Sequence, residues 1–381
     1  MDYLLSNAHV VLPNTTINPG WVSIEDGRIS GVGAQAACPP AHAAQHDDLQ
    51  GKLILPGIVD LHCDMIERMV QPRPGVEIPV GVALHATDRL LLGCGVTSEF
   101  HSLSLDDDEF GVRSDRFVGA FLERLSNEKH CRARHFVHAR VEVSSEHGVH
   151  ALASMVGHPC LRLISVMDHS PGQGQYADER AFRNYIVQTT GRSDAEIDLI
   201  LERKRIAMNY IPANIAHVLA VAQAHDIPVA SHDDDAPEKI ASWAARGLRI
   251  AEFPTTLEAA HAAHHAGLAV GMGAPNVLRG QSSGGNLNAR TALVAGVVDW
   301  LCADYYPAAL LPAVFMLAEQ GIIDLAAAVA LISHNPAQAV GIAHELGSIS
   351  VGHAADLIVV ERSPDPIVRQ VFVAGRLVMR I

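Results

Sequence analysis

The stretch Ile58-Val59-Asp60-Leu61-His62-Cys63-Asp64 shows the pattern that decides the fold, an apolar strand-like run that ends in polar side chains. Seven similar runs follow, and several precede Ala- and Leu-rich amphipathic segments. The strand-like runs cover residues 58–62, 96–101, 136–143, 161–167, 228–231, 249–253, 268–272 and 297–303. The helix-like segments include residues 194–208, 215–225, 256–266 and 325–331. Eight strands that each precede a helix predict an α/β fold with a (β/α)8 TIM-like barrel of about 250 residues. A doubly wound sheet is the alternative.

The two ends of the chain carry a different pattern. Residues 3–12, 21–33, 355–360 and 368–379 alternate as half-buried strands do, and residues 34–48 are predicted to be a loop. Asp26-Gly27 is a strong hairpin signal, and Ala374-Gly375-Arg376 is a second turn. We therefore expect residues 1–56 and 347–381 to form one small β-domain that brackets a catalytic domain at residues 57–346.

Composition narrows the class of protein. The chain has 381 residues, of which 49% are hydrophobic and 18% are charged, so it is too apolar to be disordered. Its formal charge of −14 argues against nonspecific binding to nucleic acid or to an anionic membrane. No run predicts a membrane span or a signal peptide. The six cysteines form no CxxC pair, which is typical of reduced thiols in a cytoplasmic protein.

Metal-binding types of side chain gather where the predicted strands end, which is where barrels carry their chemistry. The candidate ligands are His62, Asp64, Glu142, His169 and His232. Imidazole and carboxylate bind Zn²⁺ and related divalent ions, and a bridging carboxylate at Glu142 would let two metal ions share the site. A bound metal ion would lower the pKa of a coordinated water, and Asp304 would act as the general base that takes its proton.

Several of these residues have a plainer interpretation. A single histidine is more often a satisfied polar residue than a ligand, and Glu142 has an alternative role as the ion-pair partner of Arg140. Asp234 or Asp235 is expected to be a helix N-cap. His101 also ends a predicted strand and is a further candidate for the pocket.

The segment at residues 273–286 is rich in small residues and follows the seventh predicted strand. Barrels often hold phosphate in loops at this position, and small residues let backbone N–H groups approach an anion. Arg279 can clamp such an anion bidentately. Asn276, Arg279, Ser282 and Ser283 are the predicted substrate contacts. A flexible loop without a ligand is the alternative, here and at residues 170–175.

Some motifs resemble a known family. Leu55-Pro56-Gly57 ahead of His62, and Gly352-His353-Ala354-Ala355-Asp356 near the end, are similar to the amidohydrolase superfamily. Longer strings resemble its phosphonate-catabolism branch. These strings are Gln71-Pro72-Arg73-Pro74, Met167-Asp168-His169-Ser170-Pro171-Gly172-Gln173, Ala230-Ser231-His232-Asp233-Asp234, Ala251-Glu252-Phe253-Pro254-Thr255-Thr256 and Asp304-Tyr305-Tyr306-Pro307. The resemblance runs over essentially the whole chain.

The resemblance implies a metal-dependent barrel with a small β-sandwich built from both termini. It also implies release of pyrophosphate from a sugar-phosphonate 5-triphosphate. The five metal positions and the Asp304 base carry over, with one or two divalent ions per chain. Zn²⁺ is expected, and Mn²⁺ or Fe²⁺ are the alternatives. The superfamily's usual His-x-His on the first strand is His62-Cys63-Asp64 here, and Gly174 stands where the family loop often has a basic residue.

Three functions are therefore compared. The first is hydrolysis of a small phosphorylated substrate, with no nucleic-acid or membrane partner. The second is a C–N hydrolase on the same scaffold, such as a deacetylase, deaminase or cyclic amidase. The third is a metal-free relative that only binds. An apolar segment at residues 308–317 either packs on the barrel or forms a homodimer contact.

Overall fold

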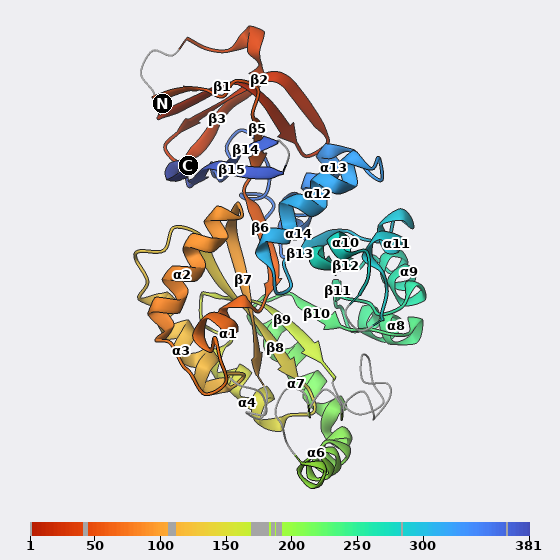
Figure 1. Cartoon of the computed structure of the whole chain (residues 1–381). Coiled ribbons are helices and arrows are strands. Elements are labelled where there is room, and N and C mark those ends of the chain that lie inside the picture. The colour runs from red at the N-terminus through yellow and green to blue at the C-terminus, as the bar shows by residue number, and fades with distance from the viewer. Residues whose placement is uncertain are drawn as a thin grey trace.

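The computed structural model describes residues 2–40, 45–105, 112–168, 183, 187, 193–282, 285–362 and 365–381. Two sheets dominate these residues, and Figure 1 shows them one above the other. The upper sheet is built from both ends of the chain. The lower sheet is an eight-stranded parallel barrel flanked by helices. The predicted fold is therefore confirmed.

The barrel strands follow one another in sequence order, each hydrogen-bonded to the next. They are β6 (Ile58–Cys63), β7 (Val96–Leu105), β8 (Arg134–Glu142), β9 (Leu161–Met167), β10 (Val229–His232), β11 (Ile250–Glu252), β12 (Ala269–Gly273) and β13 (Trp300–Cys302). All eight predicted strands are present. Sequential order around a closing sheet excludes the doubly wound alternative, in which the strand order reverses.

Contacts between β6 and β13 close the barrel. Cys63 and Asp304 form a parallel bridge, and the backbone N–H of Asp304 donates to the carbonyl of His62 at 2.8 Å. At the other end of the two strands, Leu301 N–H and Val59 N–H donate to the carbonyls of Leu331 and Ile332. The first and last strands therefore meet where the candidate site residues lie.

Helices cover the outside of the barrel. They are α1 (Met65–Val70), α2 (Val80–Gly93), α3 (Asp115–Ser126), α4 (Glu146–Met155), α6 (Asp194–Ala207), α7 (Ile211–Ala224), α8 (Pro237–Ala245), α9 (Leu257–His265), α10 (Ala274–Arg279), α11 (Ala289–Val294), α12 (Leu310–Glu319), α13 (Leu325–Ala330) and α14 (His334–Ala339). Short 3₁₀ turns lie at Gln35–Ala37, Met208–Tyr210 and Pro307–Ala309. Most of α12 is buried in the chain's own core, as one of the two interpretations of residues 308–317 predicted. No helix among the described residues has the length and apolar character that crossing a bilayer requires.

The terminal sheet contains eight strands. They are β1 (Tyr3–Leu12), β2 (Thr15–Glu25), β3 (Arg28–Ala34), β4 (Gln45–Asp48), β5 (Leu53–Pro56), β14 (Leu357–Arg362), β15 (Pro366–Val373) and β16 (Arg376–Arg380). The sheet curves around an apolar core. Tyr3 of β1 packs edge-on against Phe372 of β15 at 5.0 Å between ring centres, although two strands separate β1 from β15 in the sheet. The loop prediction for residues 34–48 was wrong at its end, since β4 pairs with β1 there.

The hairpin signals in the sequence were correct. Asp26 and Gly27 both adopt positive φ, at 50° and 77°, and connect β2 to β3. Ala374 and Gly375 do the same between β15 and β16, at 46° and 73°. Two consecutive positive-φ residues match the right-handed twist of the strands they join, which explains why these dipeptides predict the turns.

Candidate metal centre

Two histidines and one glutamate meet at the carboxyl ends of three barrel strands. His62 is the penultimate residue of β6, His232 ends β10 and Glu252 ends β11. The Glu252 carboxylate reaches both rings, with Oε1 3.2 Å from His62 Nδ1 and Oε2 3.2 Å from His232 Nδ1. One ligand-type atom from each residue lies within 4.8 Å of the others. This is the donor set that Zn²⁺ and similar ions prefer.

The charge state of this set suits a divalent cation. Burial lowers the pKa of His62 well below its ordinary value, and burial lowers that of His232 to about 3. Burial alone would raise the pKa of Glu252, but His138 and His232 outweigh it, and the pKa is lowered. At neutral pH the cluster is therefore two neutral imidazoles and one carboxylate.

His138 supports the cluster from β8. Its Nε2 lies 3.7 Å from Glu252 Oε2 and bonds to the Ser165 hydroxyl at 2.9 Å, and its Nδ1 bonds to the Leu61 carbonyl at 3.0 Å. Polar groups that fix a ligand's orientation in this way tune a metal site. The sequence analysis missed both His138 and Glu252. Glu252 carried a usable signal, because it lies at the end of the strand predicted at residues 249–253.

The other predicted ligands lie outside this tight set. Asp64 occupies the N-cap position of α1, and Arg113 Nη2 lies 3.6 Å from its Oδ2. Glu142 ends β8, is fully buried, and accepts a hydrogen bond from the Ser144 hydroxyl at 2.7 Å. His169 lies outside the described residues. The assignment of Asp64, Glu142 and His169 as ligands stays a prediction.

A cavity of about 250 Å³ connects the cluster with the predicted substrate loop. Its lining includes His62, His232, Asp64 and Asp304, together with Asn276, Arg279 and Ser282. The tertiary structure thus brings predicted residues from separate segments to one cavity. Ser283 lies outside the described residues.

Asn276 and Arg279 differ in whether their polar groups are available to bind a ligand. Both ends of the Asn276 amide are bonded to backbone, since Nδ2 donates to Leu287 O at 3.0 Å and Oδ1 accepts from Ala289 N at 3.1 Å. Arg279 is exposed at the end of α10, and its guanidinium makes no ion pair with a described residue. Arg279 is therefore the available cation on this wall, while Asn276 holds the loop in shape.

Asp304 has the properties of a general base. Burial first, and then the neighbouring Asp64 charge, raise the pKa of Asp304 to about 7. A carboxyl group with such a pKa exchanges protons readily near neutral pH. The hydrogen bond from its backbone to His62 holds it beside the cluster.

The backbone around the cavity is strained. Asp233, Phe253 and Asp304 follow three different barrel strands, and all three have positive φ, at 54°, 51° and 59°. Non-glycine residues adopt this region at a cost, most of all a bulky one such as phenylalanine. Strain that recurs on three strands around one cavity is typical of a functional site.

The N-cap prediction for Asp234 or Asp235 and the pocket prediction for His101 were both wrong. The N-cap of α8 is Ala236, because the Asp234 carboxylate instead accepts from the Trp243 indole at 2.9 Å and pairs with the Ser231 hydroxyl. His101 does not line the cavity, since its Nε2 bonds to His135 Nδ1 at 2.8 Å.

The proposed Arg140–Glu142 ion pair is also wrong. Arg140 makes no ion pair with a described carboxylate, and its Nη2 lies 3.4 Å from His232 Nε2.

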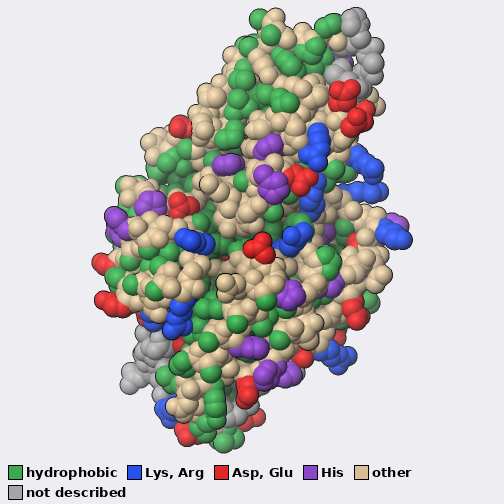
Figure 2. Space-filling model, turned by 180° about the vertical axis from the view of Figure 1, so that it is seen from behind, with side chains coloured by type: hydrophobic (Ala, Val, Ile, Leu, Met, Phe, Trp, Pro, Cys, Tyr) green, Lys and Arg blue, Asp and Glu red, His purple; other side chains and the backbone are tan. Residues whose placement is uncertain are grey.

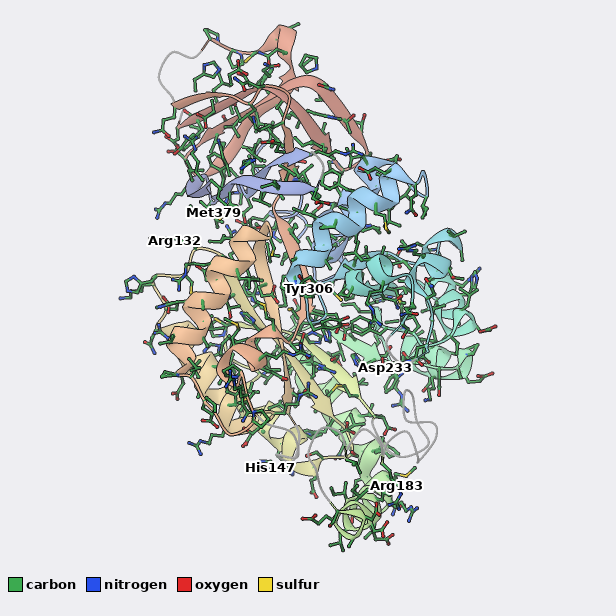
Figure 3. All side chains as sticks on the ribbon, in the orientation of Figure 1. Arg132, His147, Arg183, Asp233, Tyr306 and Met379 are labelled. Atoms are coloured by element: carbon green, nitrogen blue, oxygen red, sulfur yellow. The ribbon has the colours of Figure 1, made fainter. Side chains whose placement is uncertain are left out.

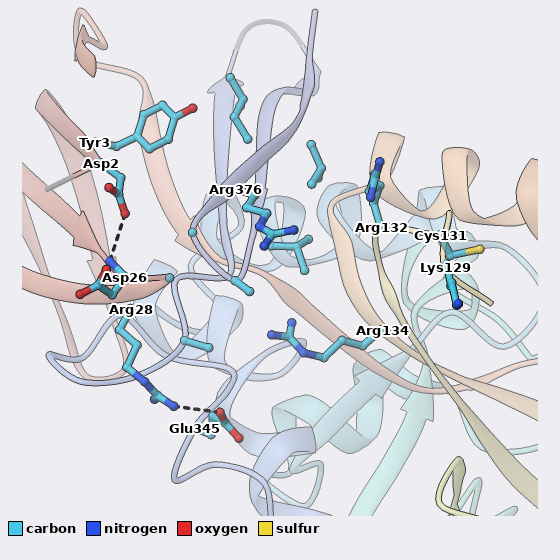
Figure 4. Close-up of a pocket in the computed structure, with 17 residues that line it drawn as sticks. Asp2, Tyr3, Asp26, Arg28, Lys129, Cys131, Arg132, Arg134, Glu345 and Arg376 are labelled. Atoms are coloured by element: carbon cyan, nitrogen blue, oxygen red, sulfur yellow. Dashed lines mark hydrogen bonds and ion pairs between the residues drawn. The ribbon is translucent and has the colours of Figure 1, made fainter. Parts of the chain in front are cut away.

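A second, larger cavity of about 900 Å³ lies between the terminal sheet and the barrel (Figure 4). Arg132 and Arg376 line it, and Arg28 there pairs with Glu345 at 3.4 Å. Figure 2 shows Lys and Arg side chains gathered at this level of the molecule. In Figure 3, Arg132 lies beside the terminal sheet and far from Asp233 at the strand ends. None of the predicted site residues lines this cavity, so it is separate from the metal centre.

Comparison of the sequence with known proteins defines the class. Residues 203–378 match the amidohydrolase family. The chain belongs to this family of hydrolases, whose members generally bind divalent metal ions. Over 372 residues, which are 96% of each chain, it is 32% identical to the α-D-ribose 1-methylphosphonate 5-triphosphate diphosphatase of Escherichia coli (strain K12).

Solved structures share the fold over the whole chain. A molinate hydrolase has a TM-score of 0.68 at 16% identity, covering 99% of this chain and 94% of that one. A prolidase complexed with N-methylphosphonate-L-proline has a TM-score of 0.65 at 17% identity, covering all of both chains. An N-acetylglucosamine-6-phosphate deacetylase from Pasteurella multocida has a TM-score of 0.63 at 15% identity, covering 98% and 99%. At these identities the likeness establishes the fold.

Proposed function

We propose that this chain hydrolyses a phosphoanhydride bond of a sugar-phosphonate 5-triphosphate and releases pyrophosphate. The observation that carries the proposal is the single cavity that holds both the His62–His232–Glu252 cluster and Arg279. Hydrolysis of a triphosphate needs a metal-binding centre and a cation for the phosphate chain within one site. The name of the Escherichia coli relative supports this choice of substrate.

His62, His232 and Glu252 would hold the metal ion. The residues fit it because the two imidazoles are neutral, the glutamate is ionised, and all three are buried. When bound, a divalent cation lowers the pKa of coordinated water and polarises phosphoryl oxygens. The donor set of two imidazoles and one carboxylate is one that Zn²⁺ binds, so Zn²⁺ is the metal we propose.

Asp304 performs the proton transfer. Its carboxylate takes a proton from the attacking water and returns it to the leaving pyrophosphate. The positive φ of Asp304 and the bond from its backbone to His62 hold this carboxylate at the cavity wall. Arg279 then binds phosphate oxygens from the segment after the neighbouring strand β12, and its fork of N–H donors matches their geometry.

The test follows phosphorus directly. Purified protein loaded with Zn²⁺ is incubated with α-D-ribose 1-methylphosphonate 5-triphosphate, and ³¹P NMR is recorded over time. We expect the pyrophosphate resonance to appear together with that of the 5-phosphate product. Metal content is measured on the same sample. Absence of pyrophosphate from a fully loaded enzyme would contradict the proposal.

A C–N hydrolase is the second candidate. The cluster with Asp304 is also competent to attack a carbonyl, and the deacetylase with the same fold gives this candidate a concrete form. The two candidates differ in their need for Arg279. A phosphate chain requires a cation on the loop, whereas a neutral amide does not. Hydrolysis of an amide substrate by the Zn²⁺-loaded protein, with no pyrophosphate released from the triphosphate, would favour the second candidate.

A further inference from the structure

Arg140 is a buried cation that forms no close ion pair with a described carboxylate, although its charge acts at longer range on Glu67, Glu252 and Asp304. It lies on β8, lines the metal-centre cavity, and is only 8% exposed. No described carboxylate pairs with its guanidinium, and its buried Nε has no hydrogen-bond partner. Within the described part of the chain, its guanidinium contacts His232, with Nη2 3.4 Å from Nε2. Burying a charge in this way costs free energy unless something compensates it.

Two other arginines near this site have acceptors within the protein. Arg113 donates to Glu67 at 2.9 Å and lies 3.6 Å from Asp64. Arg290 donates to the carbonyls of Val277 and Leu278 and so completes the end of α10. An arginine with a structural role therefore has protein acceptors here. A structural role of this kind does not explain why the guanidinium of Arg140 lies in the cavity without a close acceptor.

The contact with His232 indicates what that explanation is. Arginine only donates hydrogen bonds, so His232 Nε2 is the acceptor and His232 Nδ1 donates to Glu252. A metal ion held by His62, His232 and Glu252 would put a second positive charge beside this guanidinium. An anion is the group that satisfies both.

We infer that Arg140 is a substrate-binding residue that holds an anionic phosphoryl oxygen next to the metal ligands. The inference rests on the proposed function and deepens it. It places a cation at the reacting phosphorus, whereas Arg279 lies on the outer loop. Negative charge on the non-bridging oxygens is what such a cation stabilises during phosphoryl transfer. A neutral amide would leave Arg140 unsatisfied, so the cavity selects phosphoanhydrides.

The experiment measures anion binding apart from turnover. Inorganic phosphate is titrated into Zn²⁺-loaded protein at fixed ionic strength and followed by isothermal titration calorimetry. The variants are Arg140→Gln, Arg140→Lys and, as a control, Arg132→Gln in the distant cavity between the terminal sheet and the barrel. Zinc content and Tm are recorded for each. The control removes the same charge from the protein without touching the site.

We expect Arg140→Gln to lose at least about tenfold in phosphate affinity, the usual effect of removing a charged hydrogen bond. Arg140→Lys should recover part of it, and Arg132→Gln should bind as the parent does. Zinc content should be unchanged, and the Tm without phosphate should stay near that of the parent, because the substitution breaks no close ion pair with a described residue. A purely structural arginine would instead lower the Tm.

Unchanged phosphate affinity in Arg140→Gln, or a lower Tm together with lost zinc, would overturn the inference. Failure of the proposed function is a separate result. If the parent protein does not hydrolyse the triphosphate but binds phosphate through Arg140, the role of Arg140 in binding an anion stands and the proposed substrate is wrong. If Arg140→Gln hydrolyses the triphosphate at the parent rate, the function stands and the role of Arg140 is wrong.

Discussion

Asp60 of the first barrel strand accepts a hydrogen bond from the backbone N–H of Ala303, which directly follows the last strand, with Oδ1 3.0 Å from N. The same oxygen lies 3.3 Å from the backbone nitrogen of His62. One buried side chain thus joins the two strands that close the barrel. It also fixes the position of His62, a candidate ligand, and of Ala303, which directly precedes the candidate base Asp304.

Removing this contact should destabilise the barrel. Asp60→Ala leaves the buried N–H groups of Ala303 and His62 without their acceptor, and each such loss costs about 1–3 kcal/mol. We expect the free energy of unfolding of the metal-free protein to fall by about 2 kcal/mol or more in urea titrations. Asp60→Asn keeps Oδ1 as an acceptor and should lose less. Equal stability of the two variants would contradict the role given to Asp60.

Glu252 should be needed for metal binding. Glu252→Gln removes the carboxylate that lies between His62 and His232, so we expect the affinity for Zn²⁺ to fall at least about tenfold in chelator competition. Glu67→Gln is the control, because Glu67 is also buried but belongs to none of the candidate ligand groups among the described residues. Glu142→Gln tests the ligand predicted from the sequence. Lost zinc in Glu142→Gln with full zinc in Glu252→Gln would reverse our assignment.

Zinc content also tests whether the chain is a metal-free binding protein. Elemental analysis of the protein as gently isolated should find about one divalent ion or more per chain. Chelation should then abolish hydrolysis, and added Zn²⁺ should restore it and raise the Tm. A metal-free protein that gains neither stability nor activity from added Zn²⁺, Mn²⁺ or Fe²⁺ would point to the binding-protein alternative.

Asp304 should make the stability of the metal-free protein depend on pH. Its pKa is raised from the ordinary 3.8 to about 7, so between these values the folded protein holds a proton that the unfolded chain has lost. The stabilisation is complete below pH 3.8 and is lost as the pH rises to 7. Relative to Asp304→Asn, the parent should therefore lose up to about 4 kcal/mol from pH 4 to pH 8 in denaturant titrations. If the difference in unfolding free energy between the parent and Asp304→Asn did not change with pH, the raised pKa of Asp304 would be contradicted.

The same substitution should remove activity. Without a carboxylate to accept the proton, Asp304→Asn should lower kcat by about 100-fold or more, with a smaller effect on KM. The loaded zinc content should stay near one per chain, which separates a lost base from a lost metal. A variant with parental kcat would show that another group takes the proton.

Arg279 should matter for binding the phosphate chain. Arg279→Ala removes an exposed guanidinium at the cavity wall, and we expect KM for the triphosphate to rise about tenfold with a smaller change in kcat. Arg162→Ala is the control, since Arg162 is exposed on β9 and does not line the cavity. Equal effects of the two variants would mean that charge on the protein as a whole, not Arg279 itself, sets the KM.

The sequence by itself determined the barrel. The sequence contains eight apolar runs typical of strands and two dipeptides typical of turns. Both signals depend on local backbone preferences, which do not require knowing which segments pack together. His62, His232 and Asp304 could be singled out for the same reason, because each lies directly at or after a strand end. The family motifs added the chemistry expected of those positions.

Only the tertiary structure decided which side chains meet. Glu252 lay near the end of a predicted strand, but only the fold shows that its carboxylate lies between two imidazoles that are far from each other in the sequence. Arg140 looked like the partner of Glu142, two residues away, but its guanidinium lies against His232 of the strand two positions along the barrel. Distances across a barrel depend on strand register and closure, which are cooperative properties of the whole chain and leave no local trace in the sequence.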